Sequence, residues 1–406
     1  MLLRTASTFR RLWVGQFVST IGDGMQRIAL LWWAKHDGGN GLLVAVALST
    51  IIPTIVCSPI GGWFADHLDR RILMAGADLV RLGLSGLLAL LLFGNDPPVA
   101  FVCVLVGVAS TAASVFDPTY RAAVPTIVSD EQLPAANGLD MANGAVGGLV
   151  GPLAGGALIA VTDVGWVMVA NAATFAWSAS CIATCRLPRP VGAASSGARR
   201  VRLWGTLGAL RAVPGIGRLV ALATTLNMVV APVPMMIAAL AVDRLDAGPA
   251  TFGALEMLLS AGLLVGSIAS GVLARGRLAV PFHVLGVCLA VTGAVPVAGA
   301  AVALVVGGVA IAVANTEAMT RFQRSVPEQM HGRMFGLLGS LSEGLRPAGL
   351  ALGAPVLAVA GVSGGFAVIG VGVIVATVAF ARDPRPLLGE GIRVARDHPG
   401  VPETLG

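Results

Sequence analysis

Two side chains of opposite charge lie inside the first long apolar stretch of the chain. Asp23 and Arg27 are four residues apart within residues 12–34, so on a helix they share one face. An ionisable group in so long an apolar segment is costly and is expected to be functional. A carboxylate that alternates between a proton and a cation would couple proton movement to another process. The same spacing also fits a static ion pair within one helix.

Further charges are embedded in later apolar runs. Glu317, near the end of the run 300–320, is the second candidate for a proton site, with a plain surface position as the alternative. Asp140, at the start of the run 136–161, has the same two interpretations. Two pairs spaced three residues apart are interpreted as structural: Asp78 with Arg81, and Glu343 with Arg346.

The composition explains why these charges are exceptional. Apolar residues make up 56% of the 406 residues and charged residues only 12%, about half the share usual in soluble domains. Such a chain lacks the polar surface that a soluble fold of this size needs. Its 53 glycines fit helices that pack closely within a bilayer. The sequence therefore predicts an all-α polytopic membrane protein.

Apolar windows bounded by charges and by Gly or Pro breaks predict twelve membrane-spanning helices. Their expected ranges are 12–34, 41–65, 72–94, 98–118, 136–161, 165–185, 216–241, 250–273, 279–298, 300–320, 334–358 and 364–381. Each range is close to the length that a bilayer requires.

The twelve helices divide into two pseudo-symmetric halves. Gly151 and Gly155 recur, 198 positions later, as Gly349 and Gly353, as an internal repeat predicts. The expected domains are an N-terminal six-helix bundle over 1–185, a cytoplasmic basic linker over 186–215, a C-terminal six-helix bundle over 216–381 and a cytoplasmic tail over 382–406.

The net charge of +6 is explained by orientation in a membrane. Lys35 and Arg244 lie in odd-numbered loops, whereas most other basic residues lie at the two ends or in even-numbered loops. This is the positive-inside pattern, which places both termini in the cytoplasm. We expect a multi-pass protein of a bacterial inner (plasma) membrane, in contact with lipids and with no nucleic-acid partner.

Nothing in the sequence indicates an enzyme. The five cysteines lie in apolar runs without framework spacing, and the five histidines are scattered, so neither a metal nor a cofactor is expected. No nucleotide-binding Gly-x-x-x-x-Gly-Lys-(Ser/Thr) motif is present, and no nucleophile–base pair can be assembled.

The turn between the second and third runs carries four residues at a recognisable spacing: Gly62, Asp66, Arg70 and Arg71. It resembles the loop motif Gly-x-x-x-Asp-(Arg/Lys)-x-Gly-(Arg/Lys)-(Arg/Lys) of the major facilitator superfamily of transporters, with His67 and Asp69 replacing an Arg and a Gly. The resemblance implies that Asp66 meets the amino end of helix eleven, which favours an anion, and that the arginines complete a cytoplasmic gate. An orientation role for the arginines is the alternative.

A second resemblance concerns the fifth run, which contains Gly147, Gly151, Pro152, Gly155 and Gly156. This pattern is similar to the motif associated, in that superfamily, with exporters of the drug:proton antiporter type. A proline within a helix removes one hydrogen bond and favours a kink, and glycines four residues apart form a smooth face.

A third resemblance is to the superfamily branch that contains macrolide-efflux proteins and the enterobactin exporter. It rests on Ile21-Gly22-Asp23, on Asp78-Leu79-Val80-Arg81 and on the segment from Glu131 to Asn137. The proton-relay arginine of helix four is absent, since residues 104–113 carry no charge.

The expected cavity is apolar and only lightly polar. Its candidate lining residues are Gln16, Phe17, Ser114, Phe116, Asn227, Met228 and Asn315. Flexible methionines with few fixed polar groups suit hydrophobic or amphipathic substrates of variable shape. Simple helix packing is the alternative role for these residues.

Together these features predict a monomeric secondary transporter, a proton-coupled exporter of a drug, antibiotic or secondary metabolite that works by alternating access. Its partners would be protons and a hydrophobic or amphipathic small molecule. The alternatives are an uptake porter for a small organic solute on the same fold and a non-transporting membrane sensor.

Overall fold

The computed structural model describes residues 6–94, 97–188, 216–273, 278–325, 338 and 341–381. Every regular element among these residues is helical. The elements of the first half are α2 (Ser7–His67), α3 (Arg70–Leu92), α4 (Val99–Ala123), the short η1 (Val124–Thr126), α5 (Leu133–Val161) and α6 (Val164–Ala183). Those of the second are α8 (Ile216–Val230), α9 (Val233–Ala239), the π-helical η2 (Leu240–Arg244), α10 (Pro249–Leu273), α11 (Ala279–Thr292), α12 (Val297–Ser325) and α14 (Arg346–Ala381).

Two of these helices are each divided by a single glycine. Gly39 in α2 has φ 66° and Gly361 in α14 has φ 65°, in the left-handed region that glycine enters without a steric penalty. Arg11 and Arg71, near the two ends of α2, both donate to carbonyls at the carboxyl end of α6, on Thr184 and Ala183. The chain therefore reverses at Gly39, and α2 is a hairpin of two segments.

The all-α membrane class predicted from composition is confirmed. Nine helices within the described ranges are long and apolar enough to cross a membrane, and Ala279–Thr292 is a shorter apolar helix. Because α2 and α14 each contain two predicted spans, the helices follow the expected order. The count of twelve spans stays a prediction, as do the domain limits; most of the predicted linker and the tail lie outside the described residues.

The predicted span 216–241 corresponds to one apolar segment, Gly217–Arg244, long enough to cross a membrane. The segment has a break, since α8 ends at Val230 and α9 begins at Val233. Pro232 lies between them and has no N–H to extend the first helix. The range 279–298 was too long, since α11 ends at Thr292 and α12 begins after Pro296.

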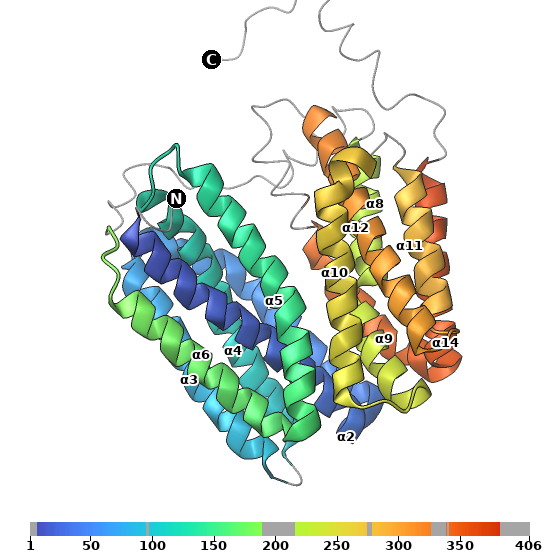
Figure 1. The fold of residues 1–406 in the computed structure, drawn as a ribbon, viewed down its shortest axis with the longest axis horizontal. Helices are drawn as coiled ribbons and strands as arrows, with labels where there is room; N and C mark the ends of the chain where they lie inside the picture. The colour runs from blue at the N-terminus through green and yellow to red at the C-terminus, as the bar shows by residue number, and fades with distance from the viewer. Residues whose placement is uncertain are drawn as a thin grey trace, which may run out of the picture.

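The helices form two bundles that stand side by side (Figure 1). In the first, α2 packs against α4, α5 and α6; in the second, α12 packs against α10 and α11, and α14 against α8 and α11. The bundles diverge toward the end of the molecule at which the N-terminus lies. They approach each other at the opposite end, the far end (Figure 1).

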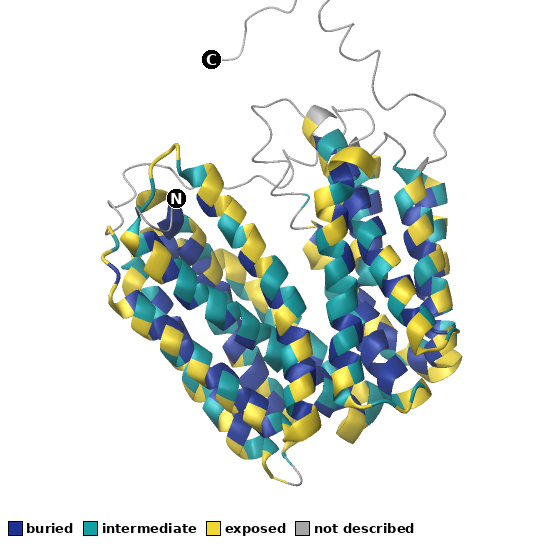
Figure 2. Ribbon diagram, in the orientation of Figure 1, coloured by how far each residue is buried: buried dark blue, intermediate teal, exposed yellow. Residues whose placement is uncertain are grey.

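Exposed positions recur along the helices (Figure 2), and many of these residues have large apolar side chains. Examples are Val56, Ile72, Leu90, Ile268, Val272 and Val359. Exposing so many apolar side chains to water would be unfavourable in free energy, whereas exposing them to the hydrocarbon of a bilayer is not.

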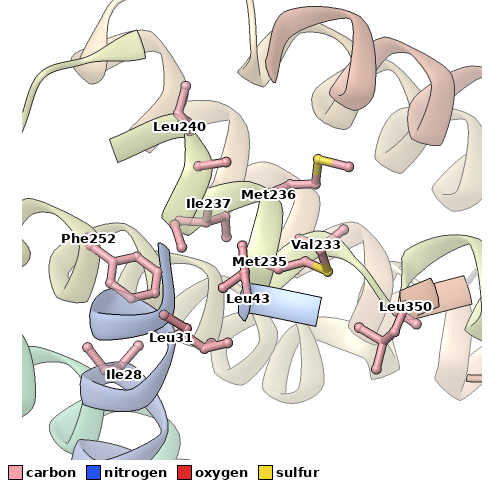
Figure 3. Packing of buried hydrophobic residues seen from close by; sticks show 14 of the residues in the cluster. Ile28, Leu31, Leu43, Val233, Met235, Met236, Ile237, Leu240, Phe252 and Leu350 are labelled. Atoms are coloured by element: carbon pink, nitrogen blue, oxygen red, sulfur yellow. The ribbon is translucent and has the colours of Figure 1, made fainter. Parts of the chain in front are cut away.

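A continuous apolar core seals the far end between the halves (Figure 3). Leu31 and Leu43, from the two segments of α2, lie beside Met235 and Ile237 of α9, with Phe252 of α10 close by. All five side chains are almost fully buried. The burial of such residues from both halves stabilises the closed far end.

The glycines of α5 bring this helix into backbone contact with both halves. Gly151 packs against Gly24 of α2, where an added Cβ would lie 2.7 Å from the Gly24 Cα. On the next turn Gly156 faces Gly253 of α10. A Cβ added to either glycine would lie 3.1 Å from the Cα of the other, so the two backbones leave no room for a side chain. Helix α5 runs through Pro152 without a break, and the Pro152 carbonyl faces Gly253.

The predicted internal repeat has a structural counterpart. Gly151 and Gly155 pack against the first segment of α2, which is the first helix of its half. Gly349 and Gly353 of α14 pack in the same way against Met228 of α8 and against Pro232 and Met235. Corresponding glycines thus make corresponding close contacts in the two halves.

The contact between α5 and α10 yields a stability prediction. A Gly253→Val substitution places its side chain against the carbonyl of Pro152, so we expect it to destabilise the closed far end by about 1–3 kcal/mol. Thermal unfolding of the purified protein should report a lower Tm.

Gly271→Val, on the same helix, is the matched control, because no described residue lies within 4 Å of an added Cβ there. An equal loss in both variants would show that valine disturbs the helix itself and not its contact with α5.

Candidate functional site

A cavity of about 550 Å³ lies between the two halves. Most of its wall is apolar, with Leu30, Ile51 and Phe175 from the first half and Met235 and Leu350 from the second. Its polar side chains come mainly from the first half: Asp23, Gln26, Arg27, Thr50, Thr54, Arg81 and Ser110, with Arg346 from α14. Such a site suits an apolar ligand that carries a small number of polar groups.

The strongest ion pair on the cavity wall joins α2 to α3. Nη2 of Arg81 donates to both carboxylate oxygens of Asp23, at 2.6 and 2.7 Å. The Arg81 guanidinium also lies 4.0 Å from the centre of the Phe175 ring, a cation–π distance. The Asp23 side chain keeps 38% of its surface exposed, whereas Arg81 keeps 8%. The carboxylate is therefore the part of this pair that a ligand can reach.

Arg27 pairs across the two halves. Its Nη1 donates to Oε2 of Glu256 on α10 at 3.0 Å, and the Glu256 side chain is only 4% exposed. The second oxygen, Oε1, has no hydrogen-bond partner among the described residues. Further toward the far end, Lys35 Nζ lies 2.6 Å from Asp243 Oδ2 in η2. These two pairs tie α2 to the second half.

The static ion pair between Asp23 and Arg27, which the sequence left open as the alternative, is not formed in this structure. The two residues are one turn apart on α2, as the spacing required, but each pairs with another helix. Arg81 approaches Asp23 with two hydrogen bonds, a geometry that an arginine of the same helix does not achieve here.

A neutral network extends the polar wall beside Asp23. Oε1 of Gln26 accepts hydrogen bonds from Asn171 at 2.6 Å and from Ser85 at 3.1 Å. Thr174 donates to Asn171 at 3.0 Å. Gln26 is thus held in a fixed orientation at the cavity wall by groups from α3 and α6.

The other two proton-site candidates lie away from the cavity wall. Glu317 is buried in α12 and lies 3.7 Å from Arg321, four residues on. Asp140 of α5 accepts a 2.6 Å hydrogen bond from the hydroxyl of Tyr120. Neither lines the cavity, and their role in coupling stays a prediction.

The predicted gate motif forms the turn from α2 to α3. Asp69, which replaces the family glycine, caps α3 by accepting from the Arg71 N–H at 2.9 Å. Arg70 donates to the Ala65 carbonyl at 3.3 Å, and Asp66 is exposed. No described residue lies within 4 Å of a Cβ built on Gly62. Most of the predicted amino end of helix eleven lies outside the described residues, so the gate stays a prediction.

The cavity-lining residues expected from sequence were wrong as a set. None of Gln16, Phe17, Ser114, Phe116, Asn227, Met228 and Asn315 lines the 550 Å³ cavity. Phe116 packs against Tyr120 in the core of the first half, and the Ser114 hydroxyl donates to the Thr111 carbonyl of its own helix. Helix α4 instead presents Val106, Ala109, Ser110 and Ala113 to the cavity.

Two important residues were missed. Arg81 was interpreted as scaffold and Glu256 was given no role, yet both hold ion pairs with cavity residues. Their position in apolar runs was a signal, but the partner of each is 58 or 229 positions away. A single sequence does not reveal such distant pairs.

The family comparison agrees with this geometry. Residues 12–348 match the model of the Major Facilitator Superfamily. The chain therefore belongs to this superfamily and is a membrane transporter. The match confirms the family resemblance noted at the Gly62 turn.

Among curated proteins, the chain is 23% identical over 358 residues to macrolide efflux protein A of Streptococcus pyogenes, covering 85% of this chain and 88% of that protein. It is 29% identical over 372 residues to the multidrug efflux pump Tap of Mycolicibacterium fortuitum, with the same coverage.

Among solved structures, the chain resembles a bacterial homologue of the iron transporter ferroportin in an inward-facing state, with TM-score 0.71, 14% identity, and coverage of 94% of this chain and 99% of that one. It also resembles the nucleoside transporter NupG, with TM-score 0.75, 11% identity and coverage of 92% and 99%. At these identities the likeness concerns the fold alone.

The pair between Arg27 and Glu256 yields a conformational prediction. Glu256→Gln removes the charge that holds Arg27 to α10, so we expect the closed far end to lose about 1–3 kcal/mol. Spin labels at Thr162 and Ala250, one in each half at the far end, should then show an added population at longer distance. Pulsed EPR on a background free of native cysteines measures this.

Glu343→Gln is the matched control, because Glu343 pairs with Arg346 within the second half. A distance distribution that stays the same in Glu256→Gln would show that this pair does not hold the far end closed.

Proposed function

We propose that this protein is a proton-coupled exporter of hydrophobic or amphipathic small molecules. The observation that carries the proposal is the Asp23 carboxylate, which lies on the wall of the cavity between the halves and is held by Arg81. A coupled carrier requires a charged group that a ligand can reach from the cavity, because its charge can be exchanged against a proton or a ligand.

Alternating access accounts for the two ends of the molecule. The far end is closed by the apolar core, the glycine contact between α5 and α10, and the ion pairs of Arg27 and Lys35. Arg10, Arg11, Arg70 and Arg71 lie near the other end, which the positive-inside rule assigns to the cytoplasm. We therefore interpret this conformation as one that receives ligand from the cytoplasm, with both termini on that side.

The substrate class follows from the cavity wall. Apolar side chains make up most of the cavity wall that carries Asp23, and Met235 lines this wall from the second half. This combination accommodates molecules of different shapes that carry a positive charge, since no rigid polar lattice restricts them. The names of the relatives, a macrolide efflux protein and a multidrug efflux pump, support the same class.

Export as the direction of transport rests on the glycine and proline pattern of α5. The contacts of Gly151 with Gly24, and of Gly156 with Gly253, give this pattern a physical basis. Smooth backbone surfaces allow one half to move against the other without interlocked side chains.

The proposal is tested in proteoliposomes with an imposed pH gradient. Macrolides and cationic dyes should each dissipate the gradient in the wild type, and Asp23→Asn should abolish this substrate-driven proton flux. We expect a reduction of at least about a hundredfold, because the variant lacks the carboxylate that binds the cationic substrate.

Asp163→Asn is the matched control, since Asp163 lies at the exposed start of α6, away from the cavity. Proton flux that survives in Asp23→Asn would remove Asp23 from coupling. Saturable inward accumulation of a solute would instead support an uptake porter, and tight binding without flux would support a sensor.

A further inference from the structure

A second carboxylate lies behind Asp23, inside the first half. Asp78 of α3 is 0% exposed, and neither of its carboxylate oxygens has a hydrogen-bond partner among the described residues. The Ser178 hydroxyl of α6 lies close to it and is likewise buried without a partner. Burial of a carboxylate without a close hydrogen bond disfavours its anion relative to the neutral acid.

Arg81 lies between the two carboxylates. One end of its guanidinium, Nη2, is hydrogen-bonded to Asp23, while the other end, Nη1, is 3.5 Å from Oδ1 of Asp78. That separation is too long for a strong hydrogen bond. A small rotation of the guanidinium over the Phe175 ring would shorten one contact and lengthen the other.

The remaining charges near this group are few. Asp23 faces it from α2, and Asp117 on α4 interacts electrostatically with both Arg81 and Asp23, with Arg121 next to Asp117. From α6 the facing group is the uncharged Ser178. Arg81 and Arg121 therefore face three carboxylates, and protonation of one of these carboxylates reduces their mutual repulsion.

We infer that Asp78 carries the transported proton, and that Arg81 moves from Asp23 to Asp78 when a cationic substrate occupies Asp23. In the observed arrangement Asp23 is ionised and bound to Arg81, and Asp78 holds a proton. When the cation takes the place of Arg81 on Asp23, the guanidinium turns to Asp78, and the proton of Asp78 leaves for water in the cavity along the path that the Arg81 side chain vacates. One positive charge enters the site and one proton leaves it, so the charge of the site is unchanged.

This exchange rests on the proposed function and gives it a mechanism. Substrate and proton compete although they bind to different carboxylates, because both depend on the position of Arg81. The proton site is shielded from the cavity, so a bulky substrate does not have to reach it. The exposed Asp23 selects the cation and the buried Asp78 holds the proton.

The test measures proton release on binding by the purified protein in weakly buffered detergent solution with a pH-indicator dye. The probe is tetraphenylphosphonium, whose permanent charge means that it releases no proton itself. The wild type should release one proton for each cation bound, and its affinity should rise by about tenfold per pH unit while Asp78 is protonated. Asp78→Asn should bind the cation without releasing a proton, and its affinity should be independent of pH. Asp78→Glu keeps a carboxylate and should therefore show both proton release and a pH-dependent affinity.

A second measurement gives its main result on the wild type, so this result does not depend on the stability of a variant. The infrared difference spectrum of the wild type on tetraphenylphosphonium binding should show loss of a protonated carboxyl band, and this band should shift in Asp78→Glu. Asp163→Asn is the control and should behave as the wild type in both experiments.

The outcomes separate the two proposals. Proton release that persists in Asp78→Asn would overturn the role of Asp78 and leave proton-coupled transport intact. Cation binding by the wild type without proton release, together with no proton flux in proteoliposomes, would overturn the proposed function and this exchange with it.

Discussion

The pairing of charges within the helices is the constraint on which the rest of this structure depends. Hydrocarbon offers no water to solvate an ion, so a charged side chain in a span needs a partner from the protein. Here the partners fall into two groups. Asp23, Arg81 and Asp78 connect α2 and α3 within the first half, whereas Arg27 and Lys35 connect α2 to the second half. The first group determines what the cavity can bind, and the second determines which end is closed.

Backbone packing complements these pairs. Glycines at the contact of α5 with α2 and α10 leave nothing to interlock, so the contacts there are dispersive and short in range. Separating two such surfaces breaks few side-chain contacts, whereas separating interlocked ridges of large side chains would require those side chains to repack. Apolar burial at the far end and the ion pairs across the halves therefore have most influence on which state is populated.

Sequence reasoning worked where the signal is local. Apolar length and Gly or Pro breaks were sufficient for the order of the helices, and the break between residues 34 and 41 coincides with Gly39. The glycine pattern of α5 is likewise visible in the sequence, whereas the helices that it contacts are not. The cavity wall was not predictable in this way, because it depends on how each helix is rotated. Gly61 packs on the Ser114 carbonyl, and the side chains of Ser114 and Phe116 are buried away from the cavity.

Ion-pair partners were the least predictable feature. A helical repeat places Asp23 and Arg27 on one face, and it gives no information about arginines on other helices. The charge that reaches Asp23 comes from α3, and the charge that reaches Arg27 comes from the other half. Local spacing therefore identified the residues and missed their connections. The connections, more than the residues alone, define the candidate mechanism.

Helix α2 provides the physical link between binding and closure. Asp23, on the cavity wall, and Arg27, bound to Glu256, lie one turn apart on the same segment. A ligand that changes the pairing of Asp23 therefore alters the electrostatic environment of the residue that ties α2 to α10. The second half contributes mostly apolar wall to the cavity, through Ala231, Pro234, Met235 and Leu350, with Arg346 as its charged member. Because the exchangeable charges are concentrated in the first half and the closing contacts lie across both, the turn of α2 from Asp23 to Arg27 is where the two processes meet.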